Sequence, residues 1–335
     1  MDGSNQNGGE LNLVCSIGID IGGTKIAAGI VQSSGVMLRK EVVPIPTSGQ
    51  QSIIQQVYDL IQNLRENAKR DSLEPVAGVG IGTAGQVDYG KGVVRSGTVN
   101  IPDWNNVPLR SVLSEKIHLP VWVDNDVNVV AIAEKFIGSA RGHRDVVCLA
   151  LGTGVGGGVV ADNRVLRGAF GAAAELGHIS IDRHGPNCNC GSRGCLEMYA
   201  SGPGIARMMV EKLRCHPEQE LGPVLFEALQ RDERMTSRLV FKCYHSGDSV
   251  AREVVHELCD ALAIGIVSLI HTFNPTIVVL GGGVMEQGEW LKNLVEERVR
   301  QLGMRSLVEA VEIAVAAAGP DAGVIGAALQ CFMEA

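Results

Sequence analysis

Two stretches of the chain repeat one pattern of apolar and polar positions. Residues 11–31 and 145–165 each contain an apolar run, a glycine-rich turn and a second apolar run. The residues after each turn are strand-like, and polar turns follow. Two strand–turn–strand hairpins about 130 residues apart predict a duplicated domain whose halves each present a turn to a shared ligand.

Strands and helices alternate over the rest of the chain. Apolar residues recur at helical spacing from Ile53 to Leu64, and Ser48 with Gln51 predicts a capping box before them. The pattern also predicts strands over 76–81, 119–123 and 276–280, and helices over 127–136, through most of 205–271 and from about 321. This alternation is typical of a parallel α/β fold, here with two duplicated halves.

The composition is that of an ordinary soluble globular protein. The 335 residues suffice for two domains, and 45% are hydrophobic and 20% charged. A net charge of −8 argues against a nucleic-acid partner, which needs a basic surface. The N-terminus has no basic region of a secretory signal, and no apolar run approaches the ~18 residues of a membrane span. We therefore expect a cytoplasmic protein with no membrane and no nucleic-acid partner.

One loop concentrates metal-binding side chains. His178, Cys188, Cys190 and Cys195 are separated mainly by glycine, proline and polar residues. Three thiolates and one imidazole form the ligand set of a closed structural zinc site, and a loop with so little apolar surface needs a bound metal to hold its shape. The alternative is a cysteine-containing turn without metal.

The remaining cysteines do not suggest a disulfide framework. Nine is an odd number and the spacing is uneven, which fits a reducing compartment. We expect the other six to be buried small apolar residues: Cys15, Cys148, Cys215, Cys243, Cys259 and Cys331.

Two glutamates flank the metal-binding loop. Glu175 lies three residues before the histidine, and Glu197 lies two residues after the last cysteine. A loop fixed by metal would hold both carboxylates at a set separation, which suits charge-assisted hydrogen bonds to vicinal hydroxyl groups.

Three glycine clusters at strand ends predict a nucleotide site. Backbone N–H groups in such turns surround phosphates, and an aspartate at the strand end can bind Mg²⁺. The first turn, Asp20 to Thr24, is by itself equally consistent with an ordinary glycine-rich hairpin. Residues 152–157 match a dinucleotide-binding motif formally, but strand residues follow where that motif needs a helix. The candidate residues are Asp20, Gly22, Gly23, Thr24, Gly152, Thr153, Gly154, Gly281, Gly282 and Gly283.

Asp126 is the candidate catalytic base. It follows a predicted buried strand, where open α/β sheets place reactive groups. In phosphoryl transfer to a hydroxyl group, such a carboxylate accepts the proton and orients the nucleophile. The alternative is a helix N-cap, and Asp126 can serve both purposes.

Longer motifs resemble one family. E-L-G-H from Glu175 and G-P-x-C-x-C-G-x-x-G-C-L-E-x-Y-x-S from Gly185 are similar to the signature of the ROK family (repressors, open reading frames, kinases), and V-D-N-D-x-N from Val123 resembles its catalytic motif. The glycine clusters resemble the two phosphate motifs and the adenosine motif of actin-like kinases. The resemblance covers nearly the whole chain from Ile19 onward. It implies the actin-like ATPase (ribonuclease H-like) fold with two duplicated α/β domains around a cleft.

The resemblance also implies roles for single residues. Asp126 becomes the base, and His178 offers one ring nitrogen to zinc and the other to a hydroxyl group. The implied sugar-binding residues are Asn125, Asp126, Glu175, His178 and Glu197, with Gly85 and Asn100 as weaker candidates.

The same resemblance implies the domain boundaries and the ligands. We expect an N-terminal domain over 11–125 with the first phosphate motif, and a C-terminal domain over 126–318 with the second phosphate motif, the zinc loop and the adenosine motif. A helix within 319–335 is expected to pack back on the N-terminal domain. The implied ligands are Mg-ATP, a hexose and one structural zinc per chain, in a homodimer or homotetramer.

The expected activity is ATP-dependent phosphorylation of the 6-hydroxyl group of a hexose, with glucose first. N-acetylmannosamine is the alternative, because the stretches around Asp126 and Glu175 also resemble N-acetylmannosamine kinases. Ala84, Gly85 and Gln86 stand where the animal-type kinase has Gly-Gly-Arg, and the missing arginine favours an unsubstituted hexose. A sugar-responsive repressor is the alternative of another class, but barely ten residues precede the first strand, too few for a helix-turn-helix domain.

Overall fold

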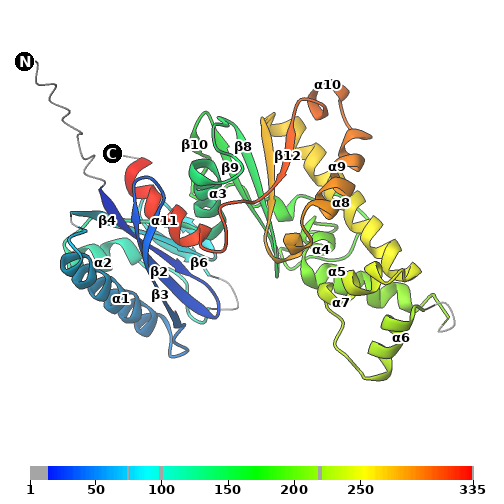
Figure 1. Cartoon of the computed structure of the whole chain (residues 1–335), viewed down its shortest axis with the longest axis horizontal. Helices are drawn as coiled ribbons and strands as arrows, with labels where there is room; N and C mark the ends of the chain where they lie inside the picture. The colour runs from blue at the N-terminus through cyan, green and yellow to red at the C-terminus, as the bar shows by residue number, and fades with distance from the viewer. Residues whose placement is uncertain (1–13, 74, 98–100, 218–220, 334–335) are drawn as a thin grey trace, which may run out of the picture. The chain divides into compact units, whose positions relative to one another are not determined.

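In a computed structural model, the chain forms two compact α/β units (Figure 1). The structure describes residues 14–73, 75–97, 101–217 and 221–333. Unit 1 is Met1–Val129 with Gly323–Ala335, and unit 2 is Val130–Ala322. The boundaries expected from the sequence, after residues 125 and 318, each lie four residues earlier than these.

The sheet of unit 1 has five strands in the order β3-β2-β1-β4-β7. The first three strands are antiparallel neighbours, and β4 and β7 run parallel to β1. A small hairpin, β5 and β6, stands apart from this sheet. The strand bounds are β1 Cys15–Ile21, β2 Lys25–Gln32, β3 Met37–Pro44, β4 Val76–Thr83, β5 Gln86–Asp88, β6 Val93–Ser96 and β7 Val121–Asn125.

The sheet of unit 2 repeats this arrangement. Its order is β10-β9-β8-β11-β12. The first three strands form antiparallel pairs, and β11 pairs in parallel with both β8 and β12. The predicted duplication is therefore confirmed at the level of topology. The bounds are β8 Val146–Leu151, β9 Val155–Ala161, β10 Arg164–Val165, β11 Ile277–Gly281 and β12 Glu312–Val315.

Helices complete each unit. In unit 1 these are α1 (Gln50–Arg70), α2 (Leu109–Ile117) and α11 (Ala322–Met333), and α3 (Asp126–Ile137) begins directly after β7. In unit 2 they are η1 Leu176–His178, α4 Glu197–Ala200, α5 Gly202–Leu213, α6 Pro223–Gln230, α7 Ser237–His245, α8 Ser249–Phe273, η3 Gly283–Gln287, α9 Glu289–Arg300 and α10 Arg305–Val308.

Helix α11 packs closely on the sheet of unit 1 because glycines face it. Side chains alternate between the faces of a strand, so Ile17 and Ile19 point into the core with α1 while Gly18 faces the other way. A side chain at Gly18 or at Gly80 of β4 would overlap the α11 backbone. The buried hydroxyl of Ser16 donates to the Ala328 carbonyl at 2.9 Å. The C-terminal helix thus belongs to unit 1 by close backbone contact.

Two local expectations are wrong. Helix α1 begins after Gly49, which has φ 96° and makes no side-chain capping bond, so Ser48 and Gln51 form no capping box. Cys215 is exposed, whereas the other five cysteines outside the metal loop are buried.

Helix α8 contradicts the expectation that no segment is apolar enough and long enough to span a membrane. By length and composition it is long and apolar enough to cross a membrane. Single charged and polar residues interrupt its apolar positions, which is why no continuous run shows in the sequence. Core helices of soluble proteins pass the same test, and 61% of its most apolar window is buried.

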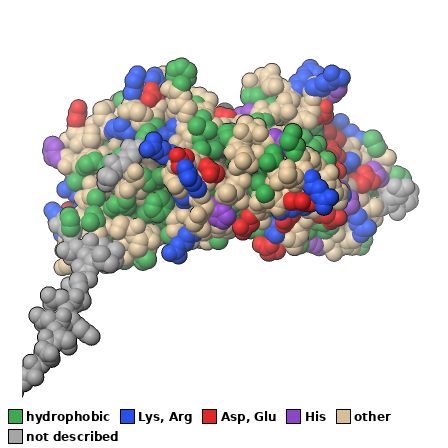
Figure 2. All heavy atoms as spheres, turned by 90° about the horizontal axis from the view of Figure 1, so that it is seen from above, with side chains coloured by type: hydrophobic (Ala, Val, Ile, Leu, Met, Phe, Trp, Pro, Cys, Tyr) green, Lys and Arg blue, Asp and Glu red, His purple; other side chains and the backbone are tan. Residues whose placement is uncertain are grey.

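The surface carries charges of both signs. Figure 2 shows Lys and Arg side chains interspersed with Asp and Glu over the face in view, with hydrophobic side chains scattered among them.

Candidate functional site

Two carboxylates lie near the carboxyl edge of the unit 1 sheet. Asp20 of β1 pairs with Gly82 of β4, which pairs in turn with β7, and Asp126 begins α3 just beyond β7. Burial and, to a smaller extent, the negative charge of Asp126 together raise the pKa of Asp20 to about 6, although the positive charge of Lys25 opposes the rise. A divalent cation would stabilise two carboxylates in such a position.

Asn125 contributes most of the cap of helix α3. Its Oδ1 accepts hydrogen bonds from the backbone N–H groups of Val127 (2.8 Å) and Asn128 (3.2 Å), and Asp126 Oδ1 accepts a third from Val127 (3.0 Å). The Asn125 amide donates to the Gly85 carbonyl at 3.0 Å. Two predicted sugar-binding residues, Asn125 and Gly85, therefore touch each other.

Gly85 needs to be glycine. Its φ is 105°, and a side chain there would overlap the Ser96 carbonyl. Asn100, the other weak candidate, lies outside the described residues.

Asp124 and Asn128, for which the sequence indicated no role, hold the start of helix α3 in place. The buried Asp124 carboxylate accepts from the Asn125 backbone N–H and from the Asn128 amide, both at 2.8 Å. These bonds hold the first turn of α3, and therefore Asp126, in a defined position.

The first predicted phosphate turn connects β1 to β2. The Gly22 N–H donates to the Lys25 carbonyl at 3.1 Å, which closes the turn, and Thr24 at its tip is exposed. This turn lies in the same unit as Asp20 and Asp126.

The predicted zinc ligands converge in unit 2. The ligand atoms of His178, Cys188, Cys190 and Cys195 all lie within 4.8 Å of one another. Cys190 Sγ is 3.6 Å from Cys195 Sγ, and Cys188 Sγ is 3.6 Å from His178 Nδ1. Zn–S bonds of about 2.3 Å in a tetrahedron place sulfur atoms roughly 3.8 Å apart, so the donor set and its spacing fit zinc.

The predicted metal-binding loop is joined to the second predicted phosphate turn through Glu197. This residue begins α4 two positions after Cys195, and its Oε2 accepts a hydrogen bond from the Val155 N–H at 3.0 Å. Val155 directly follows the Gly152–Gly154 turn at the start of β9. A strand follows this turn, as expected, so the dinucleotide-binding interpretation is excluded.

Glu175 directly follows a residue with a strained backbone conformation. Ala174, just before it, has φ 65°, and the Leu176 N–H donates to the Ala174 carbonyl at 2.7 Å across Glu175. The Glu175 side chain is exposed, and such strained positions are common at ligand sites.

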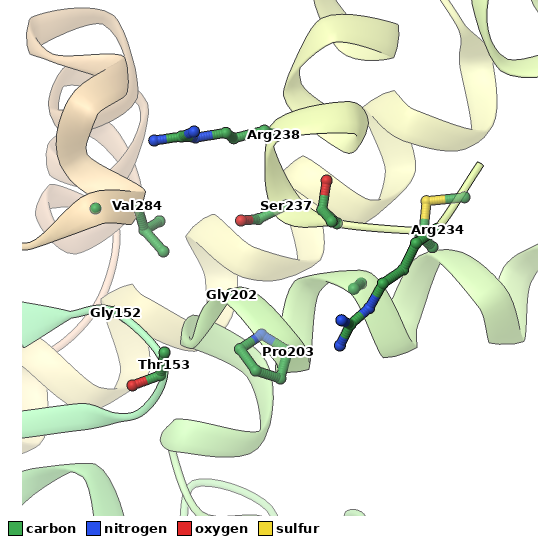
Figure 3. Close-up of a pocket in the computed structure, with 12 residues that line it drawn as sticks. Gly152, Thr153, Gly202, Pro203, Arg234, Ser237, Arg238 and Val284 are labelled. Carbon is green, nitrogen blue, oxygen red and sulfur yellow. The ribbon is translucent and has the colours of Figure 1, made fainter. Parts of the chain in front are cut away.

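A pocket of about 560 Å³ opens beside the second phosphate turn. Figure 3 shows Gly152 and Thr153 of the turn, Gly202 and Pro203 of α5, and Val284 of η3 around it. Gly283 of the third glycine cluster also lines the pocket, so two of the three predicted glycine clusters meet here. The other residues that line the pocket were not predicted from the sequence: Gly202, Pro203, Ala206, Arg234, Met235, Thr236, Ser237, Arg238 and Val284.

A local signal for part of this pocket was present. Ser201 before Gly202-Pro203 and Thr236 before Ser237 are helix N-caps, and each side chain accepts a backbone N–H of the first turn. These signals predict helix starts; only the fold brings them to the phosphate turn.

Comparison with known proteins assigns the family. The family model described as "ROK family" matches residues 16–331. The chain belongs to the ROK family. It is 36% identical to the glucokinase of Thermotoga maritima, over 93% of this chain and 95% of that protein.

Solved ROK structures share the fold. A ROK hexokinase from Thermus thermophilus has a TM-score of 0.80 and 34% identity, covering 96% of this chain and 99% of that one. A ROK glucokinase from Streptomyces griseus, crystallised with glucose and AMPPNP, has a TM-score of 0.75 and 34% identity, covering 94% and 98%. The family and the actin-like ATPase fold predicted from the sequence are confirmed.

Proposed function

We propose that this ROK protein transfers the γ-phosphate of ATP to the 6-hydroxyl group of a hexose and that glucose is its preferred substrate. The broader expectation, an ATP-dependent hexose kinase, is confirmed by the glucokinase and hexokinase relatives. The observation that supports glucose most directly is the 34% identity, over 94% of the chain, to a ROK glucokinase that holds glucose and AMPPNP.

In the proposed mechanism Asp126 accepts the proton of the sugar hydroxyl. Its carboxylate follows a strand end, and hydrogen bonds to Asn125 and Asp124 fix the backbone that carries it. Proton removal makes the hydroxyl oxygen a better nucleophile toward the γ-phosphorus.

Charge on the nucleotide would be neutralised by Mg²⁺ and by backbone donors. Asp20 is the proposed magnesium-binding carboxylate, because its neighbour Asp126 already raises its pKa and a cation would relieve that repulsion. Backbone N–H groups for the phosphates would come from the turns Gly22–Thr24 and Gly152–Gly154. Those for the nucleoside would come from Gly281–Gly283.

The sugar would be held by the residues around the metal-binding loop. We assign Glu175, Glu197 and His178 to sugar hydroxyl groups, together with Asn125, and keep Gly85 and Asn100 as supporting positions. Zinc bound by His178, Cys188, Cys190 and Cys195 would be structural, because four protein ligands close a tetrahedral site. His178 Nδ1 faces the cysteines, which leaves Nε2 for a sugar hydroxyl.

A coupled assay across glucose, mannose, N-acetylmannosamine and N-acetylglucosamine tests the substrate. We expect the highest kcat/KM with glucose, because an N-acetyl group would leave unpaired a carboxylate or imidazole that the bound sugar shields from water, at a cost of ~1–3 kcal/mol or one to two decades in specificity. Gln86→Arg is expected to move preference toward N-acetylmannosamine. If N-acetylmannosamine is the better substrate of the unmodified enzyme, the glucose assignment is wrong although the kinase class stands.

A further inference from the structure

The pocket beside the second phosphate turn contains two arginines in different states. Arg238 of α7 forms an ion pair with Glu286 of η3, with 3.2 Å between Nη2 and Oε2. Arg234 lines the same pocket, and among the residues that the structure describes it has no hydrogen-bond or ion-pair partner. Arg238 therefore has a partner in an exposed ion pair, and Arg234 has none among the described residues.

The two side chains also point to different parts of the pocket. In Figure 3, Arg238 extends from the start of α7 toward the segment that carries Val284, whereas Arg234 extends toward α5 and Pro203. Thr153 of the phosphate turn lies on the far side of Pro203 from Arg234 in this view. A nucleotide with its phosphates at Gly152 and Thr153 and its ribose beside Gly283 would direct its base to the part of the pocket that Arg234 lines.

The lining near Arg234 suits a base rather than a phosphate. Pro203, Ala206 and Met235 offer apolar surface there, and no acidic or amide side chain lines the pocket within the described part of the chain. Arginine is the cation best suited to such a place, because its planar, weakly hydrated guanidinium stacks on aromatic rings.

We propose that Arg234 is a nucleotide-binding residue whose guanidinium stacks on the face of the base. The proposal rests on the proposed function only in taking a nucleoside triphosphate as the ligand. Arg234 gives up no ion pair when the base arrives, whereas Arg238 would first have to leave Glu286. The contact contributes to affinity and does not read the substituents of the base, because every base offers an aromatic face.

Calorimetric titration of Arg234→Ala with ATP, ADP and AMP, in the absence of sugar, tests the contact. We expect all three affinities to fall by a similar factor of about 3 to 30, because the lost contact is to the base that they share. GTP is expected to lose the same factor as ATP. Arg234→Lys should remain weak, since an ammonium group has no planar face to stack.

Arg231→Ala is the matched control. Arg231 is an exposed arginine three positions away, paired with Glu227 and outside the pocket, so its removal should leave nucleotide affinity within about twofold. Circular dichroism of each variant establishes that it is folded.

Several outcomes would overturn the proposal. A loss seen with ATP but not with AMP, or full rescue by lysine, would make Arg234 a phosphate contact. Unequal losses for ATP and GTP would mean that it reads the edge of the base, and no loss would remove it from the site. Because the titrations contain no sugar, wild-type protein that binds ATP but phosphorylates no hexose would disprove the proposed function alone, whereas wild-type protein that binds no nucleotide would disprove both.

Discussion

Asp126 and Asp20 are close enough for the charge of one to raise the pKa of the other, and this repulsion has consequences for each residue separately. Asp126→Asn keeps the shape and the hydrogen-bond acceptor but cannot take a proton. We expect kcat to fall by ~10²–10⁴-fold with sugar affinity nearly unchanged, as measured by steady-state kinetics beside calorimetry. Asp59→Asn, an exposed change on α1, is the control. If Asp126→Asn keeps more than about a tenth of the wild-type rate, Asp126 is not the base.

Asp20 carries an electrostatic cost in the folded protein. The pKa of Asp20 in the folded protein, about 6, exceeds its usual value of 3.8, so folding disfavours the ionised form. The ionised carboxylate therefore does not lower the stability of the protein below pH 3.8, and its full cost is reached once the pH has risen through 6. Without magnesium, Asp20→Asn is therefore expected to stabilise the protein at pH 7.5 by up to about 3 kcal/mol and by much less at pH 4.5. Urea denaturation at the two pH values measures this difference.

The same substitution is expected to weaken Mg-ATP binding, since an amide is a poorer magnesium ligand than a carboxylate. For the wild type, kcat/KM for Mg-ATP should fall below about pH 6, where Asp20 becomes protonated. A variant that is no more stable at pH 7.5 would contradict the burial cost, whatever its activity.

At the scale of elements, Glu197 connects the predicted metal-binding loop to the second predicted phosphate turn. It lies two residues after Cys195, and its side chain accepts a hydrogen bond from Val155, which follows the turn. We expect about one zinc per chain in chelator-washed protein, by elemental analysis. Cys190→Ser should lower the affinity for ATP as well as for sugar, because Glu197 loses its anchor two residues after Cys195. Cys215→Ser, at an exposed cysteine outside the loop, should change neither. Metal-free protein with full activity would disprove the zinc site.

Helix α11 tests the importance of close backbone contact. At Gly80 a methyl group would overlap the Ala327 carbonyl, so Gly80→Ala is expected to destabilise unit 1 by ~1–3 kcal/mol in urea denaturation. Gly90→Ala is the control, because the nearest atom to its new methyl group would be Asp88 Oδ1 at 3.7 Å. Equal effects at both positions would mean that helix packing is not the cause.

The elements were largely predictable, and the contacts among them were not. The predicted strand over 276–280 is observed as Ile277–Gly281, because a short apolar run before glycines leaves little choice. The cap of α1 was missed because the backbone at Gly49 takes a conformation that sequence spacing cannot show. The zinc ligands lie within eighteen positions of one another and could be recognised as a set. The pocket residues could not, because Thr153, Arg234 and Val284 are far apart in the chain and meet only through packing.

At the scale of the whole molecule, each unit has a hydrophobic core of its own, one built around β1 and β4 and the other around β8 and β11. We expect calorimetric unfolding with more than one transition, in which the van't Hoff enthalpy is smaller than the calorimetric enthalpy. Gly80→Ala should lower the transition of unit 1, and removal of zinc should lower that of unit 2. A single two-state transition that both changes shift equally would show that the two cores unfold together.

The chain leaves unit 1 after Val129 and returns to it at α11, and this order matters during synthesis. All of unit 2 emerges from the ribosome before α11, whose residues cover Gly18 and Gly80 and accept the Ser16 hydrogen bond. The first sheet to be made is therefore the last to be completed. Until α11 has left the ribosome, one face of that sheet remains open to water, to chaperones and to other nascent chains.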